Sequence, residues 1–302
     1  GVETAPDGDP RHTLRLADGD AVSADYLILA DGPQRTVTNR VLDPLLPFPL
    51  TDPLGPTTAN HIAYQELPRL PAQVRGDLRG AIKFWWGYMP GHTAYPWVFP
   101  NDGTVARIGL TMPIGLDLES VEHPESYRLL RPNDERIPQG RTYIERLLET
   151  LYPEYDLAEF PLVEDRGKVG GTETYPISST RPIESPTAAN VALVGGAMGA
   201  TSAFHEGGDH VAVRTGSIAG RLAARDTMGA YNAEWHRAIG PEIRRNCIFA
   251  DMVRDYEPDD WDRLFGLVDR IVDSDGIEPR EAIYAGWSGA KLFAGYNRRK
   301  FG

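Results

Sequence analysis

The chain has 302 residues, 43 acidic and 31 basic side chains, a formal net charge of −12, and 41% hydrophobic residues. This length suffices for one large domain or two smaller ones with a sizeable core. The acidic balance excludes a nucleic-acid-binding protein that depends on a basic face, and no apolar run approaches the ~18 residues that a membrane-spanning helix needs.

Other features of the composition bear on the compartment. The sequence begins at Gly1 rather than Met and carries no signal-peptide pattern. Its single cysteine, Cys247, can form no internal disulfide, as is typical of the reducing cytoplasm. We therefore expect a cytoplasmic protein, and leave open a peripheral contact with the membrane.

Strands are expected in the first part of the chain. Residues 12–30 alternate apolar and polar side chains, turn at an Asp-Gly pair, and end in the compact apolar run 26–30, which predicts a buried strand. Asp31 and Gly32 follow at its carboxyl end. Residues 44–60 are rich in proline and polar side chains and are expected to form a crossing loop.

Residues 61–111 contain four short aromatic or β-branched segments separated by Gly, Pro, Asn and Asp, which predicts an antiparallel sheet with one buried face. The segment "YPWVFP" starts at Tyr95, so Tyr95, Trp97 and Phe99 are expected on one face of a strand. Three rings on one face would form an apolar wall, although an ordinary sheet core has the same pattern.

The second half is expected to be largely helical. Apolar residues at helical spacing predict a helix over 139–151, strand-like segments return near 159–176, and "NVALVGG" predicts a buried strand over 190–196. Further helices are predicted over 209–225, 228–239, 241–255, 258–273 and 288–298.

A glycine-rich turn, "GGAMGATSAFHEGGDHVAVRTG", begins at Gly195 and leads into the helix predicted from Asp209. Glycines allow close backbone approach, and the first turn of a helix offers free N–H groups to anions and electron-rich rings. A plain, tight contact between helix and strand has the same spacing. The pair His205 and His210 does not form a zinc motif, because the histidines lie at i and i+5 rather than i and i+4.

This turn resembles the C-terminal flavin motif of FAD-dependent oxidoreductases of the geranylgeranyl reductase and para-hydroxybenzoate hydroxylase group. The positions that match are Gly195, Ala197, Gly199, Gly208, Ala212, Arg214, Thr215, Gly216, Ala223 and Ala224. The resemblance implies that the loop runs beside the ribityl chain and pyrophosphate of FAD. It also implies that the helix N-terminus points toward the pyrimidine ring of the flavin.

Two further segments are similar to motifs of the same group. "DYLILADGPQRTV" matches a motif that lines the FAD site, at Asp25, Ile28, Ala30, Asp31, Gly32 and Val37, whereas Arg35 replaces the usual Ser. Tyr95, Trp97, Phe99 and Pro100 match the Y-x-W-x-F-P substrate-cavity signature of geranylgeranyl reductases. Flavin-dependent halogenases carry a related Trp-rich segment.

The sequence departs from the group at several positions. Gly196 stands where the group has an Asp that contacts the ribityl chain, Ala203 replaces a Pro, and Asp209 replaces an apolar residue. No G-x-G-x-x-G motif for the ADP pyrophosphate is present. The resemblance therefore implies an open cofactor site and weak FAD binding, with an N-terminal unit that lies outside this sequence, has been lost from the gene, or is supplied as a separate polypeptide.

The resulting prediction is an α/β fold: an incomplete, discontinuous FAD-binding domain at 1–50 and 185–227, an inserted antiparallel β-sheet substrate domain at 51–184, and a helical C-terminal region at 228–302. The implied substrate-binding residues are Tyr95, Trp97 and Phe99. The implied cofactor-binding residues, with FAD as cofactor, are Asp31, Gly32, Gly195, Gly196, Ala197, Gly199, Gly207 and Gly208.

The implied activity is reduction of isoprenoid C=C bonds. The electron donor and the catalytic acid are not identified, and Tyr95 and His205 are candidates for the acid by position alone. One alternative is an FAD-dependent monooxygenase or halogenase, for which Lys83 is the nearby lysine. The other is a non-catalytic fragment or partner subunit that does not bind FAD by itself.

Overall fold

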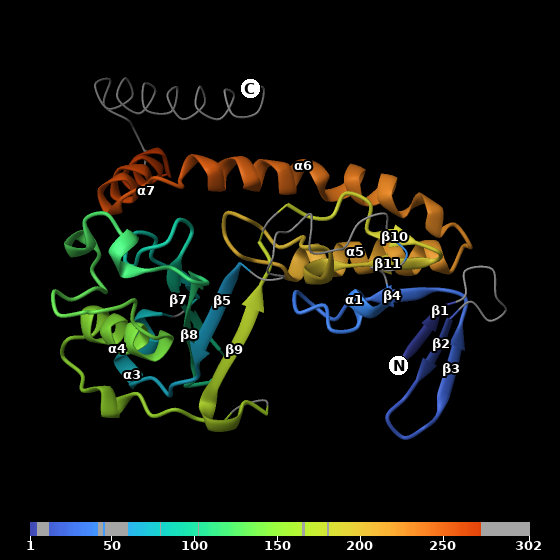
Figure 1. Ribbon diagram of the computed structural model, residues 1–302. Coiled ribbons are helices and arrows are strands. Elements are labelled where there is room, and N and C mark those ends of the chain that lie inside the picture. Colours follow the sequence, from blue (N-terminus) through green and yellow to red (C-terminus); the bar gives the residue numbers. More distant parts are fainter. Residues whose placement is uncertain are drawn as a thin grey trace. The chain divides into compact units, whose positions relative to one another are not determined.

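The computed structural model describes residues 1–4, 12–41, 45, 60–78, 80–101, 103–164, 167–179 and 181–272, without the side chains of 267–272. The chain forms two compact units (Figure 1): a first unit of Gly1–His61 and Pro176–Cys247, and a second unit of Ile62–Tyr175 and Ile248–Gly302. The helix expected at 288–298 and nearly all of the loop expected at 44–60 lie outside the described residues. The domain limits given by the resemblance stay predictions.

The first unit contains two three-stranded sheets. In one, β1 (Val2–Thr4), β2 (His12–Arg15) and β3 (Ala21–Ala24) pair antiparallel in chain order. The other has the order β10 (Thr187–Ala188), β11 (Val191–Leu193), β4 (Leu27–Leu29). Strands β11 and β4 are parallel, so their carboxyl ends meet at one edge of the sheet.

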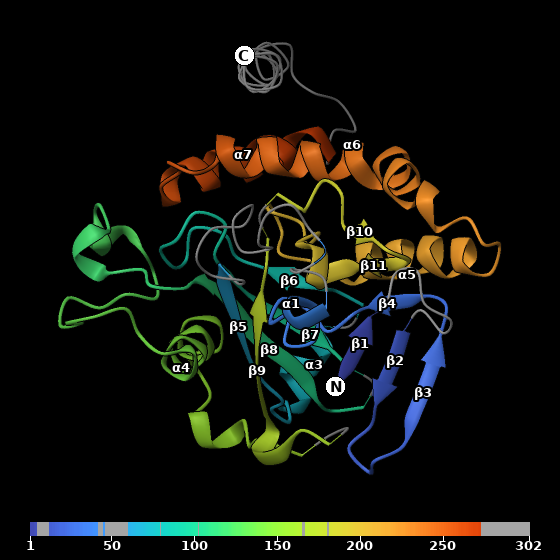
Figure 2. The same ribbon diagram turned by 45° about the vertical axis from the view of Figure 1, so that its right-hand side comes forward.

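Helices α1 (Thr38–Val41) and α5 (Asp209–Ala223) complete this sheet region, and α5 contacts β4 (Figures 1 and 2). The helix predicted over 209–225 is confirmed, and its buried residues are Val211, Thr215, Ile218, Ala219 and Leu222. Ala212, which the helical spacing places on the same apolar stripe, is exposed instead. The strand expected at 190–196 is shorter than predicted. It ends at Leu193 because Gly195 has φ +57° and begins a 3₁₀ turn.

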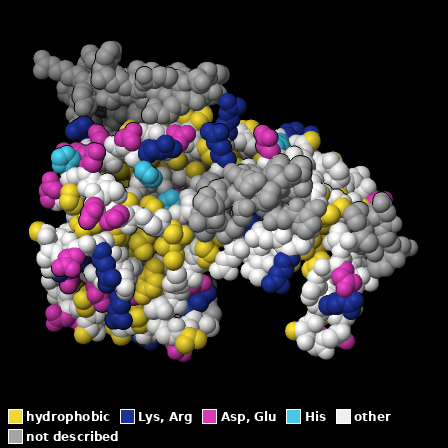
Figure 3. Space-filling model, viewed as in Figure 1, with side chains coloured by type: hydrophobic (Ala, Val, Ile, Leu, Met, Phe, Trp, Pro, Cys, Tyr) yellow, Lys and Arg dark blue, Asp and Glu magenta, His cyan; other side chains and the backbone are white. Residues whose placement is uncertain are grey.

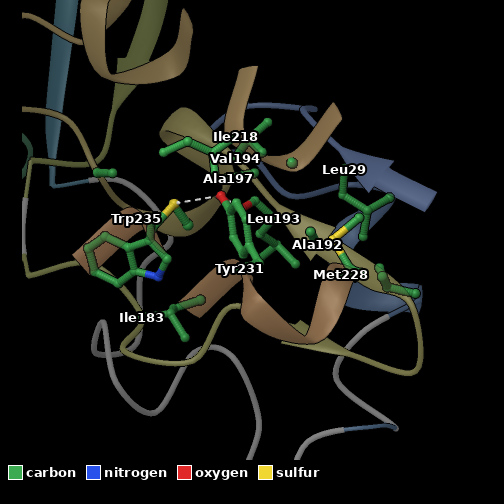
Figure 4. Close-up of a cluster of buried hydrophobic side chains, with 14 of the residues drawn as sticks. Leu29, Ile183, Ala192, Leu193, Val194, Ala197, Ile218, Met228, Tyr231 and Trp235 are labelled. Atoms are coloured by element: carbon green, nitrogen blue, oxygen red, sulfur yellow. Dashed lines mark hydrogen bonds between the residues drawn. The ribbon is translucent and has the colours of Figure 1, made fainter. Parts of the chain in front are cut away.

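Residues from helix α6 (Tyr231–Met252) close the core of the first unit. The Tyr231 hydroxyl donates a hydrogen bond of 2.8 Å to the Leu193 carbonyl oxygen, and it lies 3.7 Å from Met198 Sδ. Figure 4 shows Tyr231 among the buried side chains of this core. The indole of Trp235 is buried in the same cluster. Helix α6 is thus tied to the end of β11.

The prediction of separate helices over 228–239 and 241–255 is wrong. Residues 228–230 form a 3₁₀ turn, and α6 then runs through Pro241 without ending. Proline removes one backbone hydrogen bond of a helix. Here Trp235, Ile239 and Ile243, spaced four residues apart on both sides of the proline, are all buried in the core, and this continuous packing outweighs that loss.

The second unit is organised around a five-stranded sheet with the order β6 (Lys83–Phe84), β7 (Tyr95–Pro100), β8 (Ala106–Pro113), β5 (His61–Glu66), β9 (Thr172–Ile177). The antiparallel pairing predicted here is confirmed for β6 with β7 and for β7 with β8. One face of the sheet packs with α3 (Ala72–Asp77) and α4 (Gly140–Leu151) in a hydrophobic cluster. Figure 3 shows hydrophobic side chains gathered on this unit over the sheet.

Helix α7 (Pro258–Val272) also belongs to the second unit and packs on the segment after β6. A Cβ atom built on Gly87 would lie 3.1 Å from both Pro258 Cα and Trp261 Cδ1. The described helices include none that is long and apolar enough to cross a membrane. The remaining short 3₁₀ helices are Leu118–Ser120, Pro124–Ser126, Leu157–Glu159, Val169–Gly171, Gly195–Met198 and Met228–Ala230.

Candidate functional site

The glycine-rich turn of the first unit joins β11 to α5, as predicted. Gly195 and Gly199 both have positive φ, +57° and +75°, a conformation that glycine adopts without a steric cost. The Gly195 N–H donates a 3.0 Å hydrogen bond to Thr215 Oγ1 on α5. A Cβ atom at Gly195 would lie only 2.8 Å from the Ala212 Cβ. Glycine at this position therefore lets the turn lie directly against α5.

A second turn follows β4 and is organised by Asp31. The Asp31 carboxylate accepts hydrogen bonds from the backbone N–H groups of Val37, at 2.7 Å, and Thr38, at 3.0 Å, and from the Thr38 hydroxyl. It thereby caps α1. Gly32 has φ +73°, and a Cβ atom there would meet nothing within 4 Å. The turn thus places a short stretch of backbone beside open space.

The two turns meet at the carboxyl ends of their parallel strands. The Val194 N–H donates to the Leu29 carbonyl oxygen at 3.1 Å, and a Cβ atom at Gly196 would lie 3.0 Å from Pro33 Cδ. Ligands of open α/β sheets bind at this edge. The structure therefore brings together the predicted residues of the two turns, at 31–32 and 195–199.

Arg35 joins the same two turns and was not predicted to do so. Its side chain is fully buried, and its Nε donates a 2.6 Å hydrogen bond to the Ala197 carbonyl oxygen. The residue has φ +50°, which is uncommon for a residue other than glycine. The only signal in the sequence was that Arg35 replaces the Ser of the resembled motif.

The start of α5 forms a third side of the region. Gly208 is the N-cap residue and provides no side-chain hydrogen bond to the helix, so the first N–H groups of α5 lack the usual side-chain cap. A Cβ atom at Gly208 would lie 3.1 Å from Thr201 Oγ1, and one at Gly207 would lie 2.8 Å from His205 Nδ1. Both glycines thus stand where the chain has little room for a side chain. The positive end of the helix dipole favours an anionic or electron-rich partner here.

A buried pair of ionisable side chains precedes these glycines. Glu206 has φ +56°, and its Oε1 lies 3.7 Å from His61 Nδ1, with both side chains almost fully buried. Ser179 Oγ lies 3.2 Å from the same nitrogen. In a nucleophile–base–carboxylate relay the Ser and the carboxylate use opposite nitrogens, so this is not such a relay. The long sequence separation of His61 and Glu206 hid the pair from sequence reasoning.

His205, which was predicted as a candidate acid, directly precedes Glu206 in the sequence, and its side chain is half-buried. Burial lowers the pKa of the His205 imidazole, and the charge of His210 lowers it further, so the ring is neutral near pH 7. His210 instead contacts Glu242, with Nε2 and Oε1 2.5 Å apart. The described residues contain no group of three or more His, Cys, Asp or Glu side chains that could hold a metal ion.

In the second unit, Tyr95, Trp97 and Phe99 lie on β7 with their rings side by side, as the alternation predicts. The ring centroids are 5.9 Å apart for Tyr95 and Trp97, and 5.6 Å apart for Trp97 and Phe99. Phe84 of β6 contacts both Tyr95 and Phe99 at 5.4 Å. Trp86 extends the row, with its ring 4.6 Å from Tyr95 and 6.0 Å from Trp261 of α7. The result is an aromatic face that runs from β7 to α7.

Lys83, the lysine that a halogenase would need in the cavity, does not share this aromatic face. It pairs with Val98 across β6 and β7, whereas Phe84 pairs with Trp97. Directly paired residues lie on the same side of a sheet, and Val98 packs in the core with α3 and α4. The position of Lys83 therefore argues against the halogenase alternative.

Comparison with known proteins gives a result at the level of the fold. No protein-family model matches the sequence, and no curated protein matches it either. Among solved structures, a geranylgeranyl bacteriochlorophyll reductase-like protein from Thermoplasma acidophilum matches with a TM-score of 0.57 and 17% identity, over 91% of this chain and 62% of the other.

Two further structures extend this likeness. HpxO from Klebsiella pneumoniae, solved with FAD and uric acid, matches with a TM-score of 0.52 and 15% identity, over 88% of this chain and 60% of its own. A flavoprotein/dehydrogenase from Cytophaga hutchinsonii matches with a TM-score of 0.51 and 14% identity, over 91% and 59%. The chain has, in part, the fold of these flavoproteins. It spans about 60% of the length of each.

Proposed function

We propose that this chain is part of a flavin-dependent oxidoreductase and that the turns of its first unit hold FAD. The observation that carries the proposal is the meeting of the 31–33 turn and the 195–199 turn at the carboxyl ends of β4 and β11. The likeness to flavoprotein structures supports it, one of them with FAD bound.

The chemistry of the region fits the ribityl and ring portions of FAD. These portions need backbone donors, small side chains that allow close approach, and a positive helix end. We assign this role to the small residues Gly32, Gly195, Gly196, Ala197, Gly199, Gly207 and Gly208, together with Asp31. Asp31 acts indirectly, since its carboxylate holds the turn together through Val37 and Thr38.

The ADP pyrophosphate is the part of FAD for which the chain offers no motif. A G-x-G-x-x-G unit normally supplies backbone N–H groups to that doubly charged group, and none is present in this sequence. We therefore expect the residues of this chain to bind FAD weakly by themselves, and a pyrophosphate-binding segment from outside them to complete the site.

We further propose that the reaction is reduction of isoprenoid C=C bonds. A bound reduced flavin supplies a hydride, and the protein supplies orientation, exclusion of water and a proton. Tyr95, Trp97 and Phe99 would hold the apolar substrate. His61 and Glu206, whose Nδ1 and Oε1 atoms lie 3.7 Å apart, are further candidates for the proton source beside Tyr95 and His205.

A monooxygenase is the second candidate, because the sequence motifs leave it open and the similar HpxO structure contains FAD together with uric acid rather than an isoprenoid. Product analysis separates the two activities. The completed flavoprotein is incubated with an isoprenoid lipid, once with chemically reduced FAD under nitrogen, and once with NADPH and oxygen. A reductase product gains two hydrogen atoms per double bond under nitrogen, whereas a monooxygenase product gains one oxygen atom and forms only in air. Absence of both products would count against the proposed function.

A further inference from the structure

Strand β8 places polar residues beside the aromatic row of β7. The register pairs Tyr95 with Thr111, Trp97 with Gly109, and Phe99 with Arg107. Paired residues share one side of a sheet, and the alternate residues Ala106, Ile108 and Leu110 pack in the core on the other side. Together Tyr95, Trp97, Phe99, Arg107, Gly109 and Thr111 form what we call the Trp97 face.

Gly109 determines how Trp97 lies on this face. A Cβ atom at Gly109 would be 2.5 Å from Trp97 Cζ2 and 2.6 Å from Cε2, so the indole lies directly against the β8 backbone. The rings of Trp97 and Phe99 are stacked, with an interplanar angle of 19°. The indole of Trp97 is therefore held in place by the β8 backbone at Gly109 and by the ring of Phe99.

Three hydrogen-bonding atoms on the Trp97 face have no partner. They are the indole Nε1 of Trp97, the hydroxyl of Thr111 and Nε of Arg107, each buried and without a hydrogen bond within the described part of the chain. Trp97 is only 5% exposed, and Thr111 is fully buried. More than nine in ten buried polar groups find a partner, and each that does not costs ~1–3 kcal/mol. Three donors on the same side of the paired strands β7 and β8 indicate a ligand with hydrogen-bond acceptors.

The charges near the face favour an anionic acceptor. Glu173 of β9 is engaged by Lys168 and by Gln65, whose Nε2 donates at 2.7 Å. Burial would raise the pKa of Glu173, but these hydrogen bonds and the positive charges of Lys168 and Arg107 hold it below its usual value. The carboxylate of Glu173 is thus already paired with Lys168. Arg107 has no ion pair among the described residues, so a positive charge is left for a ligand.

We propose that the Trp97 face binds an amphiphile whose apolar body lies along Tyr95, Trp97 and Phe99 and whose anionic head group accepts hydrogen bonds from Arg107 and the Trp97 indole. A carboxylate and a phosphate share this chemistry. The proposal deepens the proposed function, on which it rests for the view that this ligand is the substrate. The binding itself requires neither FAD nor turnover.

Equilibrium binding to the full chain tests the proposal, with calorimetry below the concentration at which each probe forms micelles. The probes are two anions, farnesyl phosphate and dodecanoate, and the neutral alcohols farnesol and dodecanol. We expect both anions to bind more tightly than their alcohols. Arg107→Gln should weaken anion binding roughly tenfold to a hundredfold, as expected for loss of one charged hydrogen bond, and should change alcohol binding less than about twofold.

Matched variants separate the site from general effects. Arg75→Gln makes the same charge change on α3, which packs on the opposite face, and should leave anion binding unchanged. Trp97→Phe keeps a ring but removes the donor, and should weaken anion binding. Gly109→Ala should weaken binding of all probes, whereas Gly140→Ala, whose Cβ would clash with Tyr64 at 2.6 Å on the other face, should not. Thermal unfolding checks that each variant is folded.

The outcomes distinguish this proposal from the proposed function. Binding of dodecanoate but not of farnesyl phosphate, with the same dependence on Arg107, would support the anionic site and count against an isoprenoid substrate. Equal loss in the Arg75 and Arg107 variants, or no anion binding at all, would overturn the anionic site. If Arg107→Gln does not fold, the anionic site is tested by Trp97→Phe and by the salt dependence of dodecanoate binding. The anionic site would be overturned if dodecanoate binding is independent of salt and is unchanged in Trp97→Phe.

Discussion

Gly195→Ala should destabilise the first unit strongly, because two separate costs act at this position. The residue has φ +57°, and a left-handed conformation costs an L-residue ~1–2 kcal/mol. The added methyl would also lie 2.8 Å from the Ala212 Cβ, and overpacking of this kind typically costs ~1–3 kcal/mol. Together the loss is ~2–5 kcal/mol, a large part of the ~5–15 kcal/mol that stabilises a typical domain.

Two other glycines provide matched controls. Gly32 has φ +73°, but its Cβ would meet nothing within 4 Å, so Gly32→Ala carries the conformational cost alone, ~1–2 kcal/mol. Gly216 lies inside α5 with equally open surroundings, so Gly216→Ala should stabilise by ~0.5–1 kcal/mol.

Hydrogen exchange followed by mass spectrometry measures this prediction within the first unit, on peptides that cover β11 and α5. Exchange of these amides should be fastest in Gly195→Ala, intermediate in Gly32→Ala, and slower than wild type in Gly216→Ala. If Gly195→Ala is no more destabilised than Gly32→Ala, the close contact between the turn and α5 is refuted.

Two predictions concern the second unit. Gly87→Ala should weaken the packing of α7, because the new Cβ would lie 3.1 Å from Trp261 Cδ1 and the residue has φ +79°. Limited proteolysis between α6 and α7 should therefore become faster. An unchanged cleavage rate would contradict the contact between Gly87 and α7. Asp134 accepts two hydrogen bonds of 2.7 Å from the Arg146 guanidinium, which lower the pKa of its carboxyl. Because the pKa of Asp134 is lower in the folded state, its ionised carboxylate stabilises the folded protein above the unfolded-state pKa of ~3.9. This stabilisation is lost as the pH falls through the folded-state pKa. Urea unfolding below about pH 4 should therefore depend less on pH in Asp134→Asn than in wild type, and equal pH dependence would contradict this role.

Local patterns in the sequence correctly predicted the helices and strands that are specified by residues close together in the chain. The spacing of Tyr143, Ile144, Leu147 and Leu148 gave α4, and all four are buried as expected. The period of two gave β7 with Tyr95, Trp97 and Phe99 on one side. These features depend on neighbours within a few residues, which a sequence displays directly.

Features that depend on distant contacts were missed or wrong. Pro241 predicted a helix break, but burial of the residues on both sides keeps α6 continuous. Arg35 contacts the backbone of Ala197, and no pattern near either residue announces that bond. The pairing of β4 with β11, which joins the two glycine turns, was implied only by the resemblance to a known group. The donors of the Trp97 face depend likewise on the register of β7 and β8.

The central claim, that the paired turns hold FAD, is tested most directly by titration of FAD followed by flavin fluorescence. Three proteins are compared: the present chain, its Gly196→Asp variant, and the chain extended by an N-terminal G-x-G-x-x-G unit. Each charge-assisted bond to the pyrophosphate is worth ~1.5–3 kcal/mol, and ~1.4 kcal/mol is tenfold in affinity. We expect the extended chain to bind FAD tightly with Gly196 in place and the other two to bind weakly. Tight binding by the present chain, or no binding by the extended one, would contradict the account.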